Sequence, residues 1–172
     1  MKKFNAFRCF TACLILFATL AHVAAKDSMQ TNPTIVAGWV ELIYIGDAKT
    51  PIRAKLDTGA KTSSLNAPGY KQFKRGSKKW VRFEIATRKG ELIQIEQPLT
   101  RIARIRRARI GIVERPVIKL YVCLAGLRRE TEFTLTNRSN MNYPILIGRR
   151  FLSSQILVNS KATFLTSNSC LK

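Results

Sequence analysis

The chain has 172 residues, which is enough for one domain. Its 30 Lys and Arg residues against 10 Asp and Glu give a net charge of +20, which favours anionic partners and also serves solubility. The one histidine, His22, lies in the N-terminal segment, and removal of that segment would exclude Ser-His-Asp, Cys-His and His-based zinc chemistry. Acid–base catalysis would then depend on carboxylates, Lys, Tyr or Cys.

The first 25 residues have the layout of a secretory signal peptide. Lys2, Lys3 and Arg8 precede an uncharged apolar run, Cys9 to Ala21, and small residues lead to an expected cleavage after Ala25. The apolar run is short for a membrane span, so the sequence predicts export to the periplasm, with an uncleaved membrane anchor as the alternative. Cleavage removes three positive charges and leaves +17 on the mature chain.

The mature chain is expected to begin with a flexible polar leader, residues 26–33, and to end in a short tail, residues 169–172. It keeps two cysteines, Cys123 and Cys170. An exported protein can join them in a disulfide but does not require one.

Between these ends, residues 34–168 alternate short apolar runs with turn residues. Regular alternation indicates strands, as in Trp80–Ala86, where every second residue from Val81 is apolar. The strands expected in chain order are Ile35–Ile45, Ile52–Leu56, Thr62–Leu65, Trp80–Ala86, Leu92–Glu96, Val117–Leu124, Glu130–Thr136, Ile145–Ile147, Ile156–Val158 and Ala162–Leu165. Arg149–Gln155 is expected to form one or two helical turns. Many short strands with little helix predict a small all-β barrel or sandwich.

The segment that points to catalysis is Asp57-Thr58-Gly59-Ala60, which follows an expected strand. A carboxylate at the end of a strand is held rigidly while it faces a cleft. Gly59 lacks a Cβ and lets the backbone approach Asp57 closely, and Thr58 can hydrogen-bond across a dimer interface. A hydroxyl beside the loop, such as that of Thr62, can hydrogen-bond the outer carboxylate oxygen. The alternative for the bare tripeptide is an Asx turn between two strands.

A second element, Pro144-Ile145-Leu146-Ile147-Gly148-Arg149, lies about ninety residues downstream. Two apolar residues followed by Gly, Arg and a short helix resemble the closing part of retropepsins, the single-domain proteases of retroviruses. In that family the apolar pair packs beneath the Asp-Thr-Gly loop. The resemblance implies an all-β fold, a small closed barrel of the retropepsin type with one short C-terminal helix, covering residues 34–168.

The sequence is also similar to a bacterial family of retropepsin-like aspartic peptidases, often labelled "ATP-dependent zinc protease" and in part encoded with ATP-grasp glutamate ligases. The segments that carry this similarity are Gly38–Glu41, Ala54–Ala67, Trp80–Phe83, Glu114–Ile118, Phe133–Arg138, Met141 and Ile145–Arg150. Neither half of the label fits these residues. Zinc needs His, Cys or carboxylate ligands, and ATP usually needs a phosphate-binding loop that the sequence lacks. We therefore expect no metal and no cofactor.

The chain has one Asp-Thr-Gly, whereas aspartic peptidases use two carboxylates that share a proton around one water. One ionised carboxylate acts as general base on the water, and the protonated one polarises the scissile carbonyl. The resemblance therefore implies a homodimer in which Asp57 of each chain meets on the two-fold axis. The residues expected to support the active-site loop are Thr58, Gly59, Ala60 and Thr62, and Arg149 is expected to support the dimer.

Retropepsins cover their site with a hairpin flap, which chain order places within Thr100–Arg115. The flap candidates are Arg104, Arg106, Arg107, Arg109 and Gly111, the last as a flexible point. A cationic flap makes an acidic peptide a natural substrate, and the alternative is a solvated basic edge strand that prevents edge pairing. Lys55 is expected to point away from Asp57.

The sequence thus predicts an exported, homodimeric aspartic endopeptidase that acts on a protein or peptide. The competing hypothesis is a non-catalytic module of the same fold that binds anionic envelope components through its basic surface. The intact Asp57-Thr58-Gly59 favours the enzyme, because a binding module has no need of it. Nucleic acid is not expected as a partner, because aromatic residues are not interleaved with the arginine cluster. Contact with a membrane is expected only if the signal segment stays uncleaved.

Overall fold

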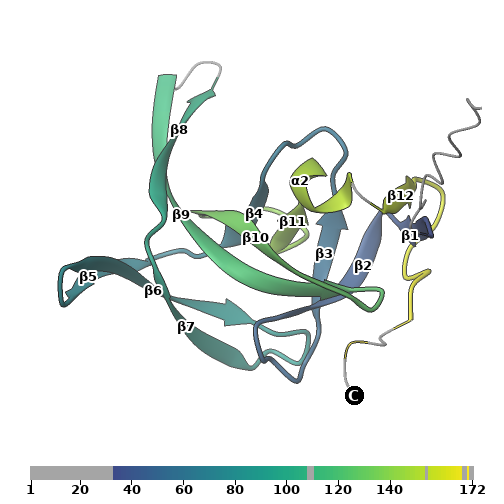
Figure 1. Ribbon diagram of the computed structural model, residues 1–172, viewed down its shortest axis with the longest axis horizontal. Helices are drawn as coiled ribbons and strands as arrows, with labels where there is room; N and C mark the ends of the chain where they lie inside the picture. Colours follow the sequence, from purple (N-terminus) through teal and green to yellow (C-terminus); the bar gives the residue numbers. More distant parts are fainter. Residues whose placement is uncertain (1–32, 108–110, 154, 168–169, 171–172) are drawn as a thin grey trace, which may run out of the picture. The chain divides into compact units, whose positions relative to one another are not determined.

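The computed structural model describes residues 33–107, 111–153, 155–167 and Cys170, and most of them form strands (Figure 1). The strands are β1 (Ile35–Gly38), β2 (Val40–Ile45), β3 (Ile52–Leu56), β4 (Ser63–Asn66), β5 (Lys71–Arg75), β6 (Lys78–Ala86), β7 (Leu92–Pro98), β8 (Arg101–Arg107), β9 (Gly111–Leu124), β10 (Leu127–Thr136), β11 (Ile145–Ile147) and β12 (Ile156–Asn159). The helix in this part of the chain is α2 (Arg149–Leu152). The all-β class is confirmed, and the predicted signal peptide lies outside the described residues. No helix within those residues is long and apolar enough to cross a membrane.

The largest sheet has the strand order β10-β4-β11-β3-β2-β9-β8. A further pairing between β10 and β9 closes the ring, so that β8 stays outside the barrel as a partner of β9. β3 pairs in parallel with β11, and β4 pairs in parallel with β10. Parallel neighbours need long connections, so two distant parts of the chain end side by side where β3 and β11 meet.

Alternation along the strands fills the barrel with apolar side chains. Ala54 and Leu56 of β3, Leu65 of β4 and Phe133 of β10 are buried in one cluster. Full burial of a side chain such as Leu or Phe contributes about 1.5–3 kcal/mol. Because successive strand residues face opposite sides, Lys55 must face away from this core.

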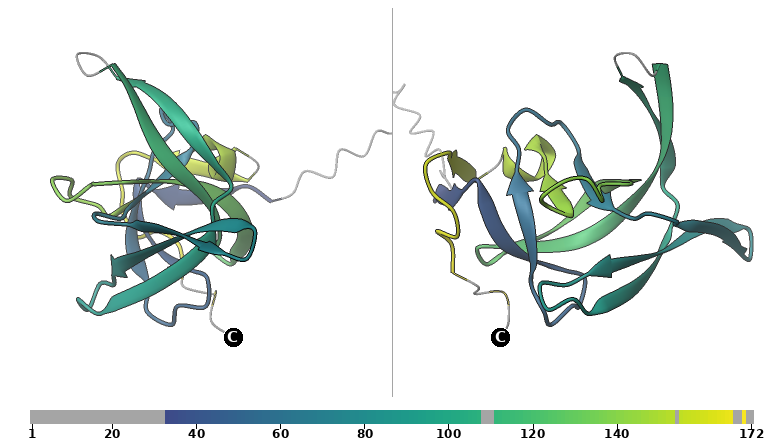
Figure 2. Two further views of the ribbon diagram at one scale, coloured as in Figure 1. Left: turned by 90° about the vertical axis from the view of Figure 1, so that its left-hand side faces the viewer. Right: turned by 180° about the vertical axis from the view of Figure 1, so that it is seen from behind.

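A three-stranded sheet of β5, β6 and β7 follows β4 in the chain (Figure 2). Its inner face, with Val81 and Phe83, belongs to the same buried cluster as the barrel. Its outer face pairs the rings of Phe73 and Trp80, whose centroids lie 6.5 Å apart. β5 was not predicted, because its five residues include one apolar side chain and its strand form depends on pairing with β6.

The two ends of the described chain differ from the sequence expectation. The predicted strand Ile35–Ile45 is interrupted at Trp39, and β1 leaves the barrel to pair in parallel with β12. The predicted strand Ala162–Leu165 was wrong. Phe164 has a φ of 53°, which breaks an extended backbone, and its N–H donates to Val40 O at 2.8 Å.

A disulfide joins Cys123 on β9 to Cys170, 47 residues later. The sequence permitted this bridge without requiring it. A cross-link that closes a loop of this length stabilises the folded state by about 4 kcal/mol in the chain-entropy model. The bridge therefore fixes Cys170 to a barrel strand.

Candidate active site

Asp57 lies directly after β3, and its environment fixes the direction of its carboxylate. Its backbone N–H donates to Ile147 O at 2.9 Å, which continues the pairing with β11. Asp57 Oδ1 accepts hydrogen bonds from the N–H groups of Gly59 and Ala60 at 2.9 and 3.2 Å. Such charge-assisted bonds are strong. Within the described part of the chain no hydrogen bond uses Oδ2, which leaves this oxygen for a reacting group.

The Asp57 loop lies against the turn between β11 and α2. Gly148 N–H donates to Ser63 Oγ at 3.1 Å, and Arg149 N–H donates to Ala60 O at 2.8 Å. A Cβ on Gly148 would lie 2.8 Å from the carbonyl carbon of Thr62 and 3.0 Å from Ala60 O. The close approach of this turn to the loop therefore requires glycine.

Arg149 forms hydrogen bonds with the Asp57 loop of its own chain. Its Nη1 donates to Thr58 O at 2.8 Å and to Gly59 O at 2.9 Å. Two carbonyl oxygens held by one guanidinium limit how far the loop can move. A contribution of Arg149 to a dimer stays a prediction.

The backbone of Thr62 lies against Gly148, where an added Cβ would be 2.8 Å from the Thr62 carbonyl carbon. Of the hydrogen bonds in the described residues, none joins its hydroxyl to Asp57, which differs from the expected role. The neighbouring hydroxyl of Ser63 instead accepts the N–H of Gly148. The hydroxyl next to the loop thus supports the turn beneath Asp57, one step away from the carboxylate.

Lys55 was expected to point away from Asp57, and the structure corrects this. Residues two apart on a strand share a face, and Lys55 Nζ lies 3.8 Å from Asp57 Oδ2. The side chains are 43% and 25% exposed, so solvent screens this pair. Lys55 nevertheless places a cation beside the oxygen that is left for chemistry.

Arg138 is a second cation near Asp57, and sequence reasoning gave it no role. Its Nη1 donates to Ser64 Oγ at 3.1 Å and its Nε donates to Tyr143 O at 3.2 Å. Burial lowers the pKa of Arg138, and the negative charge of Asp57 opposes that shift. The sequence feature that could have drawn attention to Arg138 is its position in Phe133–Arg138, one of the segments that carry the family resemblance.

The β8–β9 hairpin projects beyond the barrel (Figures 1 and 2). This is the segment that chain order assigned to a flap. Arg104 and Arg106 on β8 are exposed, and Gly111 at the start of β9 has a φ of 83° that favours glycine. Arg109 and the side chain of Arg107 lie outside what the structure describes. A cationic hairpin thus extends from the same barrel that carries Asp57.

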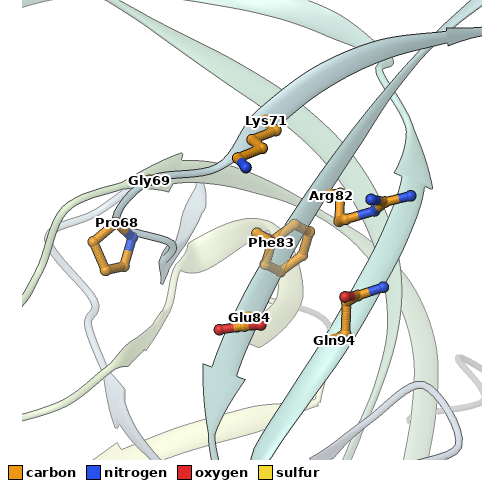
Figure 3. Close-up of a pocket in the computed structure, with 7 residues that line it drawn as sticks. All are labelled: Pro68, Gly69, Lys71, Arg82, Phe83, Glu84 and Gln94. Carbon is orange, nitrogen blue, oxygen red and sulfur yellow. The ribbon is translucent and has the colours of Figure 1, made fainter.

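A hollow of about 340 Å³ lies beside β6, apart from the Asp57 loop. Figure 3 shows Phe83 between Pro68 on one side and Arg82 and Gln94 on the other. No residue of the Asp57 loop lines this hollow. Within the described residues, no group of three or more His, Cys, Asp or Glu side chains gathers as metal ligands would.

Comparison with known proteins gives consistent matches. Residues 36–169 match a family model described as RimB-like, the retropepsin-like aspartic endopeptidase RimB. A solved structure of a Legionella pneumophila protein of unknown function is similar, with a TM-score of 0.66 and 30% identity over 77% of this chain and 98% of that chain. Curated relatives from Shewanella halifaxensis and Parasynechococcus marenigrum, each named "Probable alpha-L-glutamate ligase", are 35% and 34% identical over 116 residues. The chain spans about a quarter of the length of these two relatives.

Proposed function

Since the chain belongs to the RimB-like family of retropepsin-like aspartic endopeptidases, we propose that it hydrolyses peptide bonds as an exported homodimer. The observation that carries the proposal is the carboxylate of Asp57. Its Oδ1 is held by two backbone N–H groups, and its Oδ2 is left for a water molecule and a second carboxylate. One chain supplies one such group and the reaction needs two, so the second carboxylate comes from a second copy.

In the proposed dimer the two Asp57 carboxylates share one proton across the two-fold axis. The ionised carboxylate takes a proton from water, and the water oxygen attacks the carbon of the scissile carbonyl. The protonated carboxylate donates its hydrogen to the carbonyl oxygen as a tetrahedral intermediate forms. Collapse of that intermediate breaks the C–N bond, and the dyad returns a proton to the leaving amine.

Export is supported by two independent features of the chain. The first 25 residues have the composition of a signal peptide. The disulfide between Cys123 and Cys170 is a bond that persists in oxidising compartments and is rare in the cytosol. The periplasm fits both features.

The charges around Asp57 favour an acidic peptide as substrate. Lys55 lies beside the reacting oxygen, Arg138 lies within electrostatic reach of it, and Arg104 and Arg106 line the projecting hairpin. The two curated relatives named above are glutamate ligases by name. An acidic polypeptide would therefore find cations both beside the carboxylate and on the flap.

The test of the proposed reaction is incubation of an unbiased peptide mixture with the protein and with Asp57→Ala, from acidic to neutral pH. Cleavage by the wild-type protein that disappears in Asp57→Ala is the expected result. Equal cleavage by both proteins would refute the aspartic mechanism. Absence of cleavage by a confirmed dimer would favour the second candidate, a non-catalytic module that binds anionic envelope components through exposed residues such as Lys74, Lys78 and Lys79.

The test of substrate class is Lys55→Met, assayed on matched acidic and neutral peptides. We expect kcat/KM to fall by about fivefold more on the acidic peptide than on the neutral one, the effect of one partly exposed charge on substrate binding. Any effect of Lys55 on Asp57 itself acts on both peptides alike. Lys61→Met is the matched control, because Lys61 is an exposed residue that follows the same loop. Equal losses on both peptides in Lys55→Met would argue against an acidic substrate.

A further inference from the structure

Glu41 of β2 is a buried carboxylate that the proposed reaction does not use. It is 1% exposed, and none of the ion pairs in the described part of the chain includes it. Its Oε1 accepts the N–H of Gly38 at 2.6 Å and of Leu165 at 2.8 Å. Its Oε2 accepts the hydroxyl of Thr166 at 2.9 Å and the N–H of Thr166 at 3.4 Å. A buried polar side chain is tolerated only with such partners. Through them, Glu41 joins β1, β2 and the C-terminal segment at one point.

The segment that Glu41 holds, Ala162–Ser167, is called the strap below (Figure 1, yellow). Trp39 N–H donates to Ala162 O at 3.0 Å, and Phe164 N–H donates to Val40 O at 2.8 Å. A Cβ on Gly38 would lie 2.6 Å from Ala162 O, so the strap lies directly on the backbone there. The strap thus covers the corner between β1 and β2.

This corner is one hydrogen bond away from the catalytic strand. Leu56 N–H donates to Trp39 O at 2.8 Å, and Leu56 directly precedes Asp57. Val40 lies opposite Lys55 in the β2–β3 ladder. A continuous set of contacts therefore runs from the strap through Trp39 to the residue before the carboxylate.

The other end of the strap region is attached to the strand that carries the projecting hairpin. Cys170 is bonded to Cys123, which lies opposite Tyr44 in the β2–β9 ladder. β9 continues from there to Gly111 in the β8–β9 hairpin. Cys123 lies near the end of β9 that is opposite the hairpin, and the disulfide limits how far the strap can move from the corner.

We propose that the strap, Glu41 and the disulfide form a redox-controlled clamp on the catalytic strand, in which Glu41 is a positioning residue. Formation of the bridge takes two electrons and two protons from the thiols of Cys123 and Cys170. A partner disulfide accepts them, by thiol–disulfide exchange, and becomes two thiols. In the reduced chain only hydrogen bonds hold the strap, so the corner at Trp39 opens and Asp57 loses its exact position.

The expected functional consequence rests on the proposed peptidase activity. A chain that has not yet met an oxidant keeps its fold but cleaves slowly, and turnover rises when the bridge forms. Small displacements of a reacting group are costly, so we expect kcat to fall by about tenfold on reduction. KM should change by less than about twofold, because no strap residue is proposed to touch the substrate.

The experiment compares amide hydrogen exchange, by NMR, in the oxidised protein, the reduced protein and the Cys123→Ser/Cys170→Ser variant. Exchange at Trp39, Leu56 and Phe164 should be at least about tenfold faster without the bridge, as expected for local opening. Amides within the β6–β7 ladder are the internal control and should keep their protection. Unchanged exchange at Trp39 and Leu56 would overturn the clamp.

A second variant covers the case in which the reduced protein unfolds altogether. Thr166→Val removes the hydroxyl bond to Glu41 and leaves the disulfide intact. Faster exchange at Trp39 and Leu56 in this variant supports the clamp, and unchanged exchange overturns it. Exchange also separates this inference from the proposed function. Faster exchange in a protein that shows no Asp57-dependent cleavage would contradict the proposed peptidase activity and still support the clamp.

Discussion

At the scale of single residues, the site depends on Gly148 as much as on Asp57. The carboxylate is directed by its own loop, and that loop is directed by the turn that Gly148 opens. A Cβ at this position would meet backbone atoms of Thr62 and Ala60, which have no freedom to rotate away. The spacing between the loop and the turn is therefore set by the absence of one carbon atom.

Gly148→Ala should disturb both stability and activity. We expect a loss of about 1–3 kcal/mol in the free energy of unfolding, the usual cost of overpacking, and a large fall in cleavage. Denaturant unfolding and peptide cleavage measure the two effects. Gly76→Ala is the control for cleavage: its Cβ meets nothing within 4 Å, so cleavage should stay at the wild-type rate. Its φ of 61° by itself costs about 1–2 kcal/mol of stability. Wild-type activity in Gly148→Ala would show that the turn does not position Asp57.

Sequence reasoning found Asp57 because a short motif carries its chemistry, and it placed Gly148 through the spacing of a second motif. It misjudged Lys55, although two residues of one strand must share a face. It gave no role to Arg138, because the approach of Arg138 to Asp57 depends on how the chain folds around Ser64 and Tyr143. Long-range neighbours of this kind leave no local pattern.

At the scale of elements, Glu132 connects three parts of the fold. It lies on β10, accepts from Arg101 of β8 at 2.6 Å, and pairs with Arg150 of α2. The hydrogen bond from Arg101 is the main cause that lowers the pKa of Glu132 below 4.5, and burial opposes it. The base of the hairpin and the helix beside the Asp57 loop are thereby held to the same strand.

Glu132→Gln should make the protein less stable by about 1 kcal/mol near neutral pH, a value reduced for the partial exposure of both arginines. Because the folded-state pKa is lowered, the carboxylate stabilises the fold above pH 4.5 and loses that effect as pH falls below it. The difference in unfolding free energy between wild type and variant should therefore shrink in acid. Glu114→Gln, which removes an exposed pair, should show no difference. A constant gap at all pH values would contradict the assignment.

The β8–β9 hairpin gives a prediction about substrate choice. Arg104→Gln/Arg106→Gln should lower kcat/KM for an acidic peptide by about five- to tenfold, because two exposed charges are lost. The same variant should cleave a neutral peptide at the wild-type rate. Lys49→Gln/Lys161→Gln removes the same charge from exposed positions elsewhere and serves as the control. A uniform loss on both peptides would point to a structural role for the hairpin.

The sequence predicted secondary structure correctly where apolar and polar residues alternate strongly. The prediction failed where contacts with distant residues determine the backbone conformation. β6 and β10 follow apolar patterns that the sequence displays. β5 is a strand because it pairs with β6. Ala162–Leu165 is not a strand, because its backbone groups form hydrogen bonds with the start of β2 and with Glu41. Apolar content alone cannot distinguish an edge strand from a segment held by side chains.

At the scale of the whole molecule, the proposed dimer has a direct kinetic signature. Each active site would need one Asp57 from each of two chains. A chain that lacks the carboxylate should therefore inactivate a wild-type chain by forming a mixed dimer with it. Adding a large excess of Asp57→Ala chains to a fixed amount of wild type should lower cleavage toward zero. The same excess of an unrelated basic protein is the control. Unchanged cleavage with freely exchanging chains would mean that one chain is sufficient.

The glycine beneath the loop also bears on how one chain could acquire both carboxylates of the proposed dyad. β3 and β11 lie side by side in parallel, and one residue past their shared register the first presents Asp57 and the second presents Gly148. A mutation that installed a second carboxylate at Gly148 would place its first side-chain carbon inside occupied space. Substitution of Gly148 therefore does not offer a route to a second carboxylate in the same chain. Duplication of the gene and fusion of the two copies would supply the second carboxylate, with each half retaining its own aspartate and its own glycine.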